Sequence, residues 1–454
     1  MSGRNTLLLA IVFILLGIYV YLFELKKSED KGERLLDFKA DEVEGLTLTY
    51  PTEEIRLKKM PAGKWQITHP LSAPADESTI GNLLSLLNTS EVKRTIEERP
   101  TPEDLKNFGL DQPQVKVAVT LRKGKALPPI LVGGKSALGY SVYVRRGSES
   151  GVLLTSASVL SNLEKKPADL RDRTILDFRG DAVKRLSLEG AKGSFALTQK
   201  GAEWFLERPR PWRADQAEVK GMLSTLRRMS AQDFLEGSLA NLKKYGLDRP
   251  RLRVTVFEEE KDARHEILFG HRRQEKNQVY VALNPEGRVY TVPESVFKEL
   301  DKDLLALRDK EVFPFARDQV VKLSIHRPGE TLILVPGERG EWRVEAPKKA
   351  KASKEGVAAY LAALSDLRAN GFASDDLKDT KRYGLQPPSL RITLAGKDGK
   401  NLAGLFLGGK IQGRYYAQRE GRPTIYAIEE SAFHLLDKRL TDFLEFLEEK
   451  KERK

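Results

Sequence analysis

The pattern of apolar and polar positions repeats three times along the chain. A stripe of apolar residues at positions i, i+4 and i+7 occurs once in each third of the sequence, and these positions share one face of a helix. Each stripe therefore predicts an amphipathic helix with a buried face. The stripes are Ile80, Leu84 and Leu87, then Val219, Leu223 and Leu226, then Val357, Leu361 and Leu364. Just before them stand Asp76, Asp215 and Ser353, whose side chains can cap a helix N-terminus.

Beyond each predicted helix the apolar period changes to two, which is typical of a strand with one buried face. The alternating positions are Val115, Val117 and Val119, then Leu252, Val254 and Val256, then Leu390, Ile392 and Leu394. In the first third, the pattern predicts strands over 46–50, 55–59, 64–68, 115–121, 130–132, 141–145 and 152–155. Because successive strands are joined by short turns, we expect antiparallel pairing with the helix covering one face.

Landmark residues recur at nearly equal intervals. Gly109, Gly246 and Gly384 each lie within an aromatic-Gly-Leu phrase, and Trp65, Trp204 and Trp342 keep step with them. A further glycine, typical of a turn, follows each landmark glycine at a constant offset, at Gly133, Gly270 and Gly408. This self-similarity predicts three tandem copies of one unit, each large enough to enclose its own core.

A different pattern precedes the repeats. Residues 6–23 carry no charge and would extend about 27 Å as a helix, enough to cross a bilayer core. No small-x-small cleavage site is evident before Glu24, so we expect an uncleaved transmembrane helix rather than a signal peptide. The anchor residues are Thr6, Leu7, Leu8, Leu9, Ile11, Val12, Phe13, Ile14, Leu15, Leu16, Ile18, Tyr19, Val20, Tyr21, Leu22 and Phe23.

The residues leave the orientation of this anchor open. Lys26, Lys27, Lys31 and Arg34 outnumber the cations before the apolar run, and such counting favours a cytoplasmic C-terminal side. An anchor preceded by almost no chain is instead similar to an export signal, and long domains translocate largely regardless of charge.

These patterns predict an α+β fold of three tandem repeats, each a mainly antiparallel sheet with one amphipathic helix, preceded by a single transmembrane helix. A length of 454 residues also suggests roughly three domains at about 100 to 200 residues each. The expected segments are a short N-terminal segment 1–5, the helix 6–23, a charged tether 24–35, repeat units 36–172, 173–311 and 312–447, and a charged tail 448–454.

Composition narrows the function classes. The chain has 77 Lys and Arg against 65 Asp and Glu, and because both signs are scattered throughout, the net charge of +12 does not indicate nucleic-acid binding. There are no cysteines, which excludes disulfides, cysteine nucleophiles and thiolate metal sites.

Candidate chemistry is sparse. Gly133-Gly134-Lys135-Ser136 is similar to the end of a phosphate-binding loop, but Pro129 occupies the position of the first required glycine, which favours a β-turn. His69, His265, His271, His326 and His434 show no metal-ligand spacing, although His265 and His271 could meet across a hairpin. The pair Asp375-Asp376 lies in polar turn sequence and favours capping over catalysis. We therefore expect no catalytic, cofactor or metal site.

Aromatic residues leave a binding role open. The tryptophans and Phe108, Tyr245 and Tyr383 could stack on the faces of sugars, but their recurrence beside Gly and Leu fits core packing better. Trp212, which only the second unit has, is the more interesting exposed candidate.

With its repeated Tyr-Gly-Leu-x-x-Pro phrase and the strand that follows, the chain resembles the bacterial family classed as domain of unknown function 4340, in three copies between about Leu36 and Phe446. The resemblance implies a single-anchor envelope protein at the bacterial inner membrane, with its soluble part in the periplasm and a link to gliding-type ABC transporter components. It supplies no catalytic residues. We therefore expect a non-enzymatic accessory or scaffold, with glycan or peptidoglycan binding, and a hydrolase with an unrecognised site, as alternatives.

Overall fold

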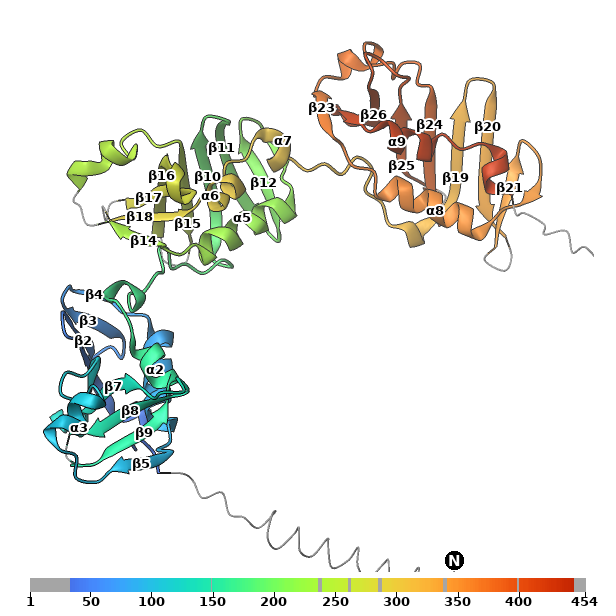
Figure 1. The fold of residues 1–454 in the computed structure, drawn as a ribbon. Helices are drawn as coiled ribbons and strands as arrows, with labels where there is room; N and C mark the ends of the chain where they lie inside the picture. The colour runs from blue at the N-terminus through green and yellow to red at the C-terminus, as the bar shows by residue number, and fades with distance from the viewer. Residues whose placement is uncertain are drawn as a thin grey trace, which may run out of the picture. The chain divides into compact units, whose positions relative to one another are not determined.

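Three sheets of nine strands each, with the same strand order, form the bulk of the protein (Figure 1). The computed structural model describes residues 33–147, 149–235, 239–259, 263–284, 288–337, 341–397 and 400–444. We call the sheets and their helices module 1 (β1–β9), module 2 (β10–β18) and module 3 (β19–β27).

Module 1 contains η2 (Ala40–Glu42), β1 (Val43–Thr49), β2 (Glu54–Lys59), β3 (Trp65–His69), β4 (Ala73–Pro74), α2 (Glu77–Thr89), β5 (Arg94–Glu97), α3 (Pro102–Asn107), β6 (Val115–Leu121), η3 (Arg122–Gly124), β7 (Ile130–Lys135), β8 (Ser141–Arg146), β9 (Val152–Ser156), α4 (Ser158–Leu163) and η4 (Pro167–Asp169). Module 2 contains β10 (Val183–Gly190), β11 (Gly193–Lys200), β12 (Glu203–Arg208), β13 (Trp212–Arg213), α5 (Gln216–Arg228), β14 (Asp233–Leu235), η5 (Leu239–Tyr245), β15 (Leu252–Glu258), β16 (Ala263–Arg273), η6 (Gln274–Lys276), β17 (Gln278–Asn284), β18 (Val289–Pro293), α6 (Glu294–Leu300) and α7 (Leu304–Leu307). Module 3 contains η7 (Arg317–Gln319), β19 (Val320–Arg327), β20 (Glu330–Pro336), β21 (Trp342–Ala346), β22 (Ala350–Lys351), α8 (Lys354–Ser365), β23 (Gly371–Ser374), η8 (Leu377–Lys381), β24 (Leu390–Gly396), β25 (Asn401–Leu407), β26 (Tyr415–Arg419), β27 (Ile425–Ile428), α9 (Glu430–Leu436) and η9 (Leu440–Phe443).

Each module is built from two meanders joined at their first strands. In module 1 the order is β4-β3-β2-β1-β6-β7-β8-β9-β5, with antiparallel neighbours, and modules 2 and 3 repeat it. The central pair is in the same register throughout, because Leu46, Leu186 and Leu323 face Val119, Val256 and Leu394. The helix α2, α5 or α8 enters between the two meanders, after the fourth strand of each module.

The predicted helices and their caps are present. The side chains of Asp76, Asp215 and Ser353 each accept a hydrogen bond from a backbone N–H of the first turn. In module 3 the stripe Val357, Leu361 and Leu364 is buried with the inward residues of β19, β20 and β24 in one core, and α8 lies along one face of its sheet (Figure 1). Apolar burial on this face supplies the main stabilisation of each module.

A smaller core lies on the other face of the sheet, beneath the aromatic-Gly-Leu phrase. Successive strand residues point to opposite faces. In module 3 Tyr415 belongs to the main core, whereas Tyr416 packs with Leu385, Ile425 and Ala427 in the smaller one. Module 2 has a corresponding cluster around Tyr245. These two sheets therefore have apolar contacts on both faces.

The expected fold class is corrected on two points. Each sheet has nine strands, where the pattern in the first third of the chain predicted seven, and short helices accompany the one amphipathic helix. The missed strands β4, β13 and β22 have two residues each, and the missed edge strands β5, β14 and β23 have four, three and four, too few to show a clear alternation. The helices α3 and α4 have six residues each, too few for a helical stripe.

The second correction concerns the membrane. The expected transmembrane residues 6–23 lie outside the described residues, as do the charged tail 448–454 and the tether 24–35 up to residue 32. Across the ranges that the structure describes, no helix is long and apolar enough to cross a bilayer. We therefore correct the fold class to three sheet repeats and no longer assign a single-pass inner-membrane location.

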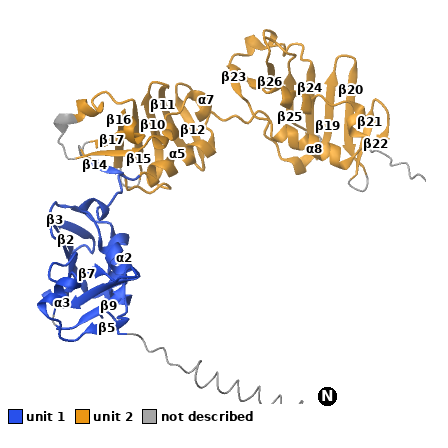
Figure 2. Cartoon of the chain, viewed as in Figure 1, with its two compact units in different colours: residues 1–175, 230–234 blue, residues 176–229, 235–454 orange. Residues whose placement is uncertain are grey.

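The chain divides into two compact units (Figure 2). One consists of residues 1–175 with 230–234, and the other of residues 176–229 with 235–454. The second unit thus holds most of module 2 and all of module 3. The repeat boundaries 36–172, 173–311 and 312–447 stay predictions, and the three sheets lie within them.

Candidate functional site

The repeated aromatic-Gly-Leu phrase forms a tight turn that only glycine fits well. Gly109, Gly246 and Gly384 have φ of +67°, +66° and +67°, a left-handed conformation that costs other residues free energy. In module 1 the turn ends α3, and the N–H of Leu110 donates to the carbonyl of Leu105 at 2.7 Å, which closes the helix end.

A close contact explains why the second glycine of each repeat keeps a constant offset from the first. A Cβ placed on Gly133, Gly270 or Gly408 would lie 2.4, 2.1 or 2.5 Å from the carbonyl oxygen of the aromatic residue in the turn. In module 1 the N–H of Gly134 donates to the same carbonyl, that of Phe108, at 2.8 Å. A strand therefore crosses the turn at a distance that excludes side chains.

The landmark aromatic residues are packing residues. Ring centroids lie 4.5 Å apart in the pair Phe108 and Tyr143, and 4.7 Å apart in both Tyr245–Tyr280 and Tyr383–Tyr416. Trp65 is 8% exposed and Trp204 2% exposed. Trp342 is half-buried. These rings stabilise the turn and the core, and Trp65 and Trp204 offer no face to a sugar.

The expected turn, histidine and carboxylate candidates do not converge on one site. Lys135 pairs with Val142 as the last residue of β7, so the Gly-Gly-Lys segment is strand rather than a phosphate loop. His265 and His271 lie on one strand, β16, and not across a hairpin, and His265 pairs with Glu258 at 3.0 Å. Among the described residues, no group of three or more His, Asp or Glu side chains could hold a metal ion.

The carboxylates of Asp375 and Asp376 have separate partners. Asp376 accepts from the N–H of Lys378 at 2.9 Å and caps η8. Asp375 instead binds Arg308 and Thr424. The pair is therefore not arranged as a catalytic dyad, and Asp375 instead contacts the chain that links modules 2 and 3.

A repeated linker motif forms a joint. Leu170-Arg171-Asp172 recurs one repeat later as Leu307-Arg308-Asp309. In both copies the arginine forms a β-bridge to the residue before the helix cap, and the residue three positions further on forms a second bridge. The bridges are Arg171 to Ala75, Thr174 to Ser230, Arg308 to Ala214, and Glu311 to Arg368. The linker is thus held by backbone hydrogen bonds at two neighbouring points.

The linker arginines stack on aromatic rings. The guanidinium of Arg171 lies 3.7 Å from the ring centroid of Phe234. Arg308 lies 4.0 Å from the ring of Phe372, the corresponding residue of module 3, and 4.3 Å from that of Trp212. Trp212 is therefore half-buried beneath a cation and is not the exposed stacking residue that the sequence suggested.

Arg308 also forms an ion pair with Asp375. Its side chain is 6% exposed and donates to the two carboxylate oxygens of Asp375 at 2.6 and 3.0 Å, and to the hydroxyl of Thr424 at 3.0 Å. Burial acts to raise the pKa of Asp375, but the hydrogen bonds from Arg308 and Thr424 outweigh it, so the pKa lies below its usual value. Asp375 is therefore a carboxylate at neutral pH.

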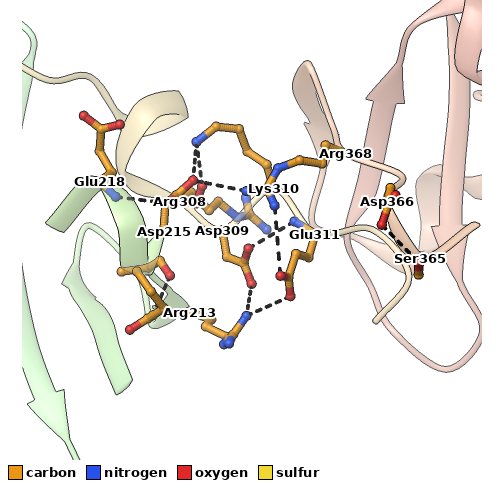
Figure 3. A network of polar contacts seen from close by, with 12 residues as sticks. Arg213, Asp215, Glu218, Arg308, Asp309, Lys310, Glu311, Ser365, Asp366 and Arg368 are labelled. Carbon is orange, nitrogen blue, oxygen red and sulfur yellow. Dashed lines mark hydrogen bonds and ion pairs between the residues drawn. The ribbon is translucent and has the colours of Figure 1, made fainter. Parts of the chain in front are cut away.

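A charged network surrounds the linker (Figure 3). Asp215 caps α5 and also accepts from Lys310 at 2.9 Å and from Arg368 at 3.4 Å. Burial alone would raise the pKa of Asp215, yet the hydrogen bond from Lys310 lowers it below the usual value. Arg213 contacts the linker carboxylates of Asp309 and Glu311 at 2.5 and 3.1 Å. These contacts link the N-cap of α5 to the chain that leads into module 3.

Sequence reasoning missed this joint, although the recurring Leu-Arg-Asp phrase was a signal for it. The phrase was visible in the predicted unit boundaries. Its aromatic partners, Phe234 and Phe372, lie far along the chain from the arginines, and no local pattern connects the two. The joint holds neighbouring parts of the chain together. The hydroxyl of Thr424 donates to the carboxylate of Asp375 at 2.8 Å, and the same carboxylate is paired with the buried Arg308.

Comparison with known proteins gives a family and little else. The model of the family described as a domain of unknown function, DUF4340, matches residues 65–207, 204–342 and 342–446. No curated protein matches the chain. Two structures from Pseudomonas aeruginosa, a DNA polymerase sliding clamp with ligand and the DNA polymerase III subunit beta, are 6% and 8% identical, with TM-scores of 0.14 and 0.13. They cover 87% and 86% of this chain and 93% and 92% of their own, and similarities this low carry no argument.

Proposed function

Because the chain belongs to the family of unknown function DUF4340, of which it has three tandem copies, we propose that it is a non-enzymatic scaffold or accessory protein. In this role the three modules bind subunits of one complex, and the linkers restrict the modules before they bind.

The observation that carries the proposal is the construction of the linkers. A passive tether is typically rich in Gly, Ser or Pro and makes few contacts. Here Arg308 is buried between two rings and paired with Asp375, and the equivalent Arg171 stacks on Phe234. Such contacts restrict the linker, and preorganised modules lose less conformational entropy when they bind a partner together. Tandem modules also raise the effective concentration of each binding surface.

An ABC transporter complex is the partner that we propose. This choice follows from the resemblance of the repeated Tyr-Gly-Leu-x-x-Pro phrase to a family linked to gliding-type transporter components. The chain carries both charge signs throughout, which suits a protein partner better than a polyanion.

Cross-linking co-purification tests this function. The tagged full-length chain is cross-linked in native cells, purified from a mild-detergent extract and analysed by mass spectrometry, with a chain lacking residues 36–446 as control. Enrichment of transporter subunits with the full-length chain alone is the expected result. Recovery of only the tagged chain would contradict the proposal.

Glycan binding is a second candidate, and one observation favours it. Half-buried Trp342 lines an open hollow of about 700 Å³ together with Lys349 and Lys351, so an aromatic residue and two cationic residues border the same space. We expect Trp342→Ala to abolish retention on purified peptidoglycan, whereas Tyr140→Ala, at a residue that is 79% exposed, leaves it unchanged. No retention of the wild-type chain would eliminate this candidate.

A further inference from the structure

A hollow of about 220 Å³ opens in module 3 beside the Tyr383-Gly384-Leu385 turn. It lies between the edge strand β23, the end of η8 and the hairpin that joins β25 to β26. Its lining combines three aromatic residues with two cations, and no acidic residue lines it. The lining includes Phe372, Tyr383, Tyr416, Arg382, Arg414 and Ile411.

A shorter hairpin distinguishes module 3 from its neighbours at this place. The segment from the second landmark glycine to the tyrosine of the next strand, here Gly408 to Tyr416, is shorter than its counterparts in modules 1 and 2. In module 2 the ring of His271 covers the turn, within 2.3 Å of a Cβ built on Gly246. Gly409 takes the place of that histidine in module 3, so no ring fills the space.

The hairpin is well defined and sets the position of Arg414. Gln412 and Gly413 have φ of +50° and +78°, the pattern of a type I′ turn. Ile411 and Arg414 exchange two backbone hydrogen bonds of 2.9 and 3.0 Å across it. The side chain of Ile411 packs against Gly384, because a Cβ there would lie 3.1 Å from its methyl group. Arg414 is thus attached to a rigid base beside the turn.

The two guanidinium groups that line the hollow lack acidic partners. In the part of the chain that the structure describes, Arg382 makes a ring contact with Tyr383 at 5.6 Å, and neither its guanidinium nor that of Arg414 forms an ion pair. Other cations of module 3 have acidic partners, since Lys410 pairs with Glu430 at 2.8 Å and Arg391 with Glu420 at 2.8 Å. Two cations beside one concave surface attract an anion.

The hollow is small, and its lining is partly aromatic and partly cationic. Its volume is below the range of about 300 to 1,000 Å³ typical of pockets that enclose drug-sized ligands. It can therefore take one ionised group and one ring or short side chain. Tyr383 is oriented by a hydrogen bond of 3.2 Å from its hydroxyl to the carbonyl of Ala373, and its ring packs against that of Tyr416 with the two planes tilted by 53°.

We infer that this hollow is a binding site for a carboxylate attached to an apolar group. Arg382 and Arg414 bind the carboxylate, a geometry for which guanidinium groups are well suited, and the aromatic rings contact the apolar group. A free organic acid and the C-terminal residue of a peptide share this chemistry. The site is independent of the scaffold role, because the test below uses the purified chain without any partner.

Ligand-observed saturation-transfer NMR on the purified full-length chain tests the site. The probes are N-acetylphenylalanine, its neutral C-terminal amide, inorganic phosphate as a competitor, and a tetrapeptide that ends in phenylalanine with a free carboxylate. The variants are Arg382→Gln, Arg414→Gln and the double variant. Arg422→Gln is the matched control, because Arg422 is an exposed arginine of the same module that does not line the hollow.

We expect N-acetylphenylalanine to bind the wild type and the control equally, and the double variant about tenfold or more weakly, as the loss of charge-assisted hydrogen bonds requires. The amide should bind much more weakly than the acid. Tighter binding of the tetrapeptide would identify a chain terminus as the source, and equal binding a small organic acid. No binding of the acid, equal binding of acid and amide, displacement by phosphate at equal concentration, or an unchanged double variant would overturn the inference. Thermal melts of all variants exclude misfolding as a cause.

Discussion

Replacing Arg308 with glutamine should loosen the linker between modules 2 and 3. The change removes the bidentate pair with Asp375, the hydrogen bond to Thr424 and the stacking between Trp212 and Phe372. Removing one partner of a buried ion pair costs about 3 to 5 kcal/mol. Asp375 is 19% exposed and so recovers some hydration, which places the expected cost near the lower end, about 3 kcal/mol. At about 1.4 kcal/mol per factor of ten, local opening becomes about 100-fold more populated.

Limited proteolysis with a glutamate-specific protease measures this opening. Its reporter bond follows Glu311, which is held in a β-bridge with Arg368, so cleavage there requires the linker to open. When reclosing is faster than cleavage, the rate follows the population of the open form. We expect fragments cut after Glu311 to appear about 100-fold faster in Arg308→Gln than in the wild type, by mass spectrometry.

The control is Arg317→Gln, which removes an ion pair with Asp366 whose side chains are 49% and 70% exposed. Exposed pairs contribute about 0 to 1 kcal/mol, so cleavage after Glu311 should change less than about fivefold. A second variant, Arg308→Gln with Asp375→Asn, should recover part of the loss because no buried carboxylate is left unpaired. Equal cleavage rates in Arg308→Gln and the wild type would refute the assignment of the joint.

Three further predictions concern the modules. Gly384→Ala should destabilise module 3 by about 1 to 2 kcal/mol, because residue 384 has a left-handed backbone conformation. The control Gly409→Ala should leave the stability nearly unchanged, because no atom lies within 4 Å of a Cβ built there. Equal melting temperatures of the two variants in calorimetry would contradict this prediction. Asp76→Ala should cost about 1 kcal/mol because Asp76 accepts from the N–H of Thr79 at 2.6 Å, and an unchanged denaturation midpoint of module 1 would disprove the cap. Burial raises the pKa of Tyr360 above its usual value of 10.0, so the folded chain keeps a proton that the unfolded chain releases. The contribution of Tyr360 to the free energy of unfolding should therefore be constant below pH 10 and fall above it, and Tyr360→Phe should reduce the fall seen above pH 10 in denaturant titrations at several pH values.

The repeat and its main core could be predicted from the sequence because each depends on local periodicity. The capped helix at Asp76 and the strand at Val115–Leu121 follow from side-chain spacing alone. The two-residue strands at the sheet edge, such as Ala73–Pro74, could not be predicted, since they exist only through pairing with β3. Pairing of this kind is a tertiary effect that overrides local propensity.

The candidate sites could not be predicted from local periodicity. The sequence suggested that Trp212 is exposed, but the guanidinium of Arg308 lies over its ring and covers it. The shortened segment between Gly408 and Tyr416 is visible in the sequence, but the hollow that it leaves depends on where His271 lies in module 2. Contacts between residues far apart in sequence decide both outcomes, and a single sequence carries no local signal for them.

Cross-linking mass spectrometry on the wild type and on Arg308→Gln and Arg317→Gln in native cells tests the scaffold role most directly. We expect at least two modules of the wild type to cross-link to subunits of the same complex, and we expect Arg308→Gln, but not Arg317→Gln, to reduce the recovery of these cross-links. Cross-links confined to the chain itself, or a pattern that is identical in all three proteins, would contradict this expectation.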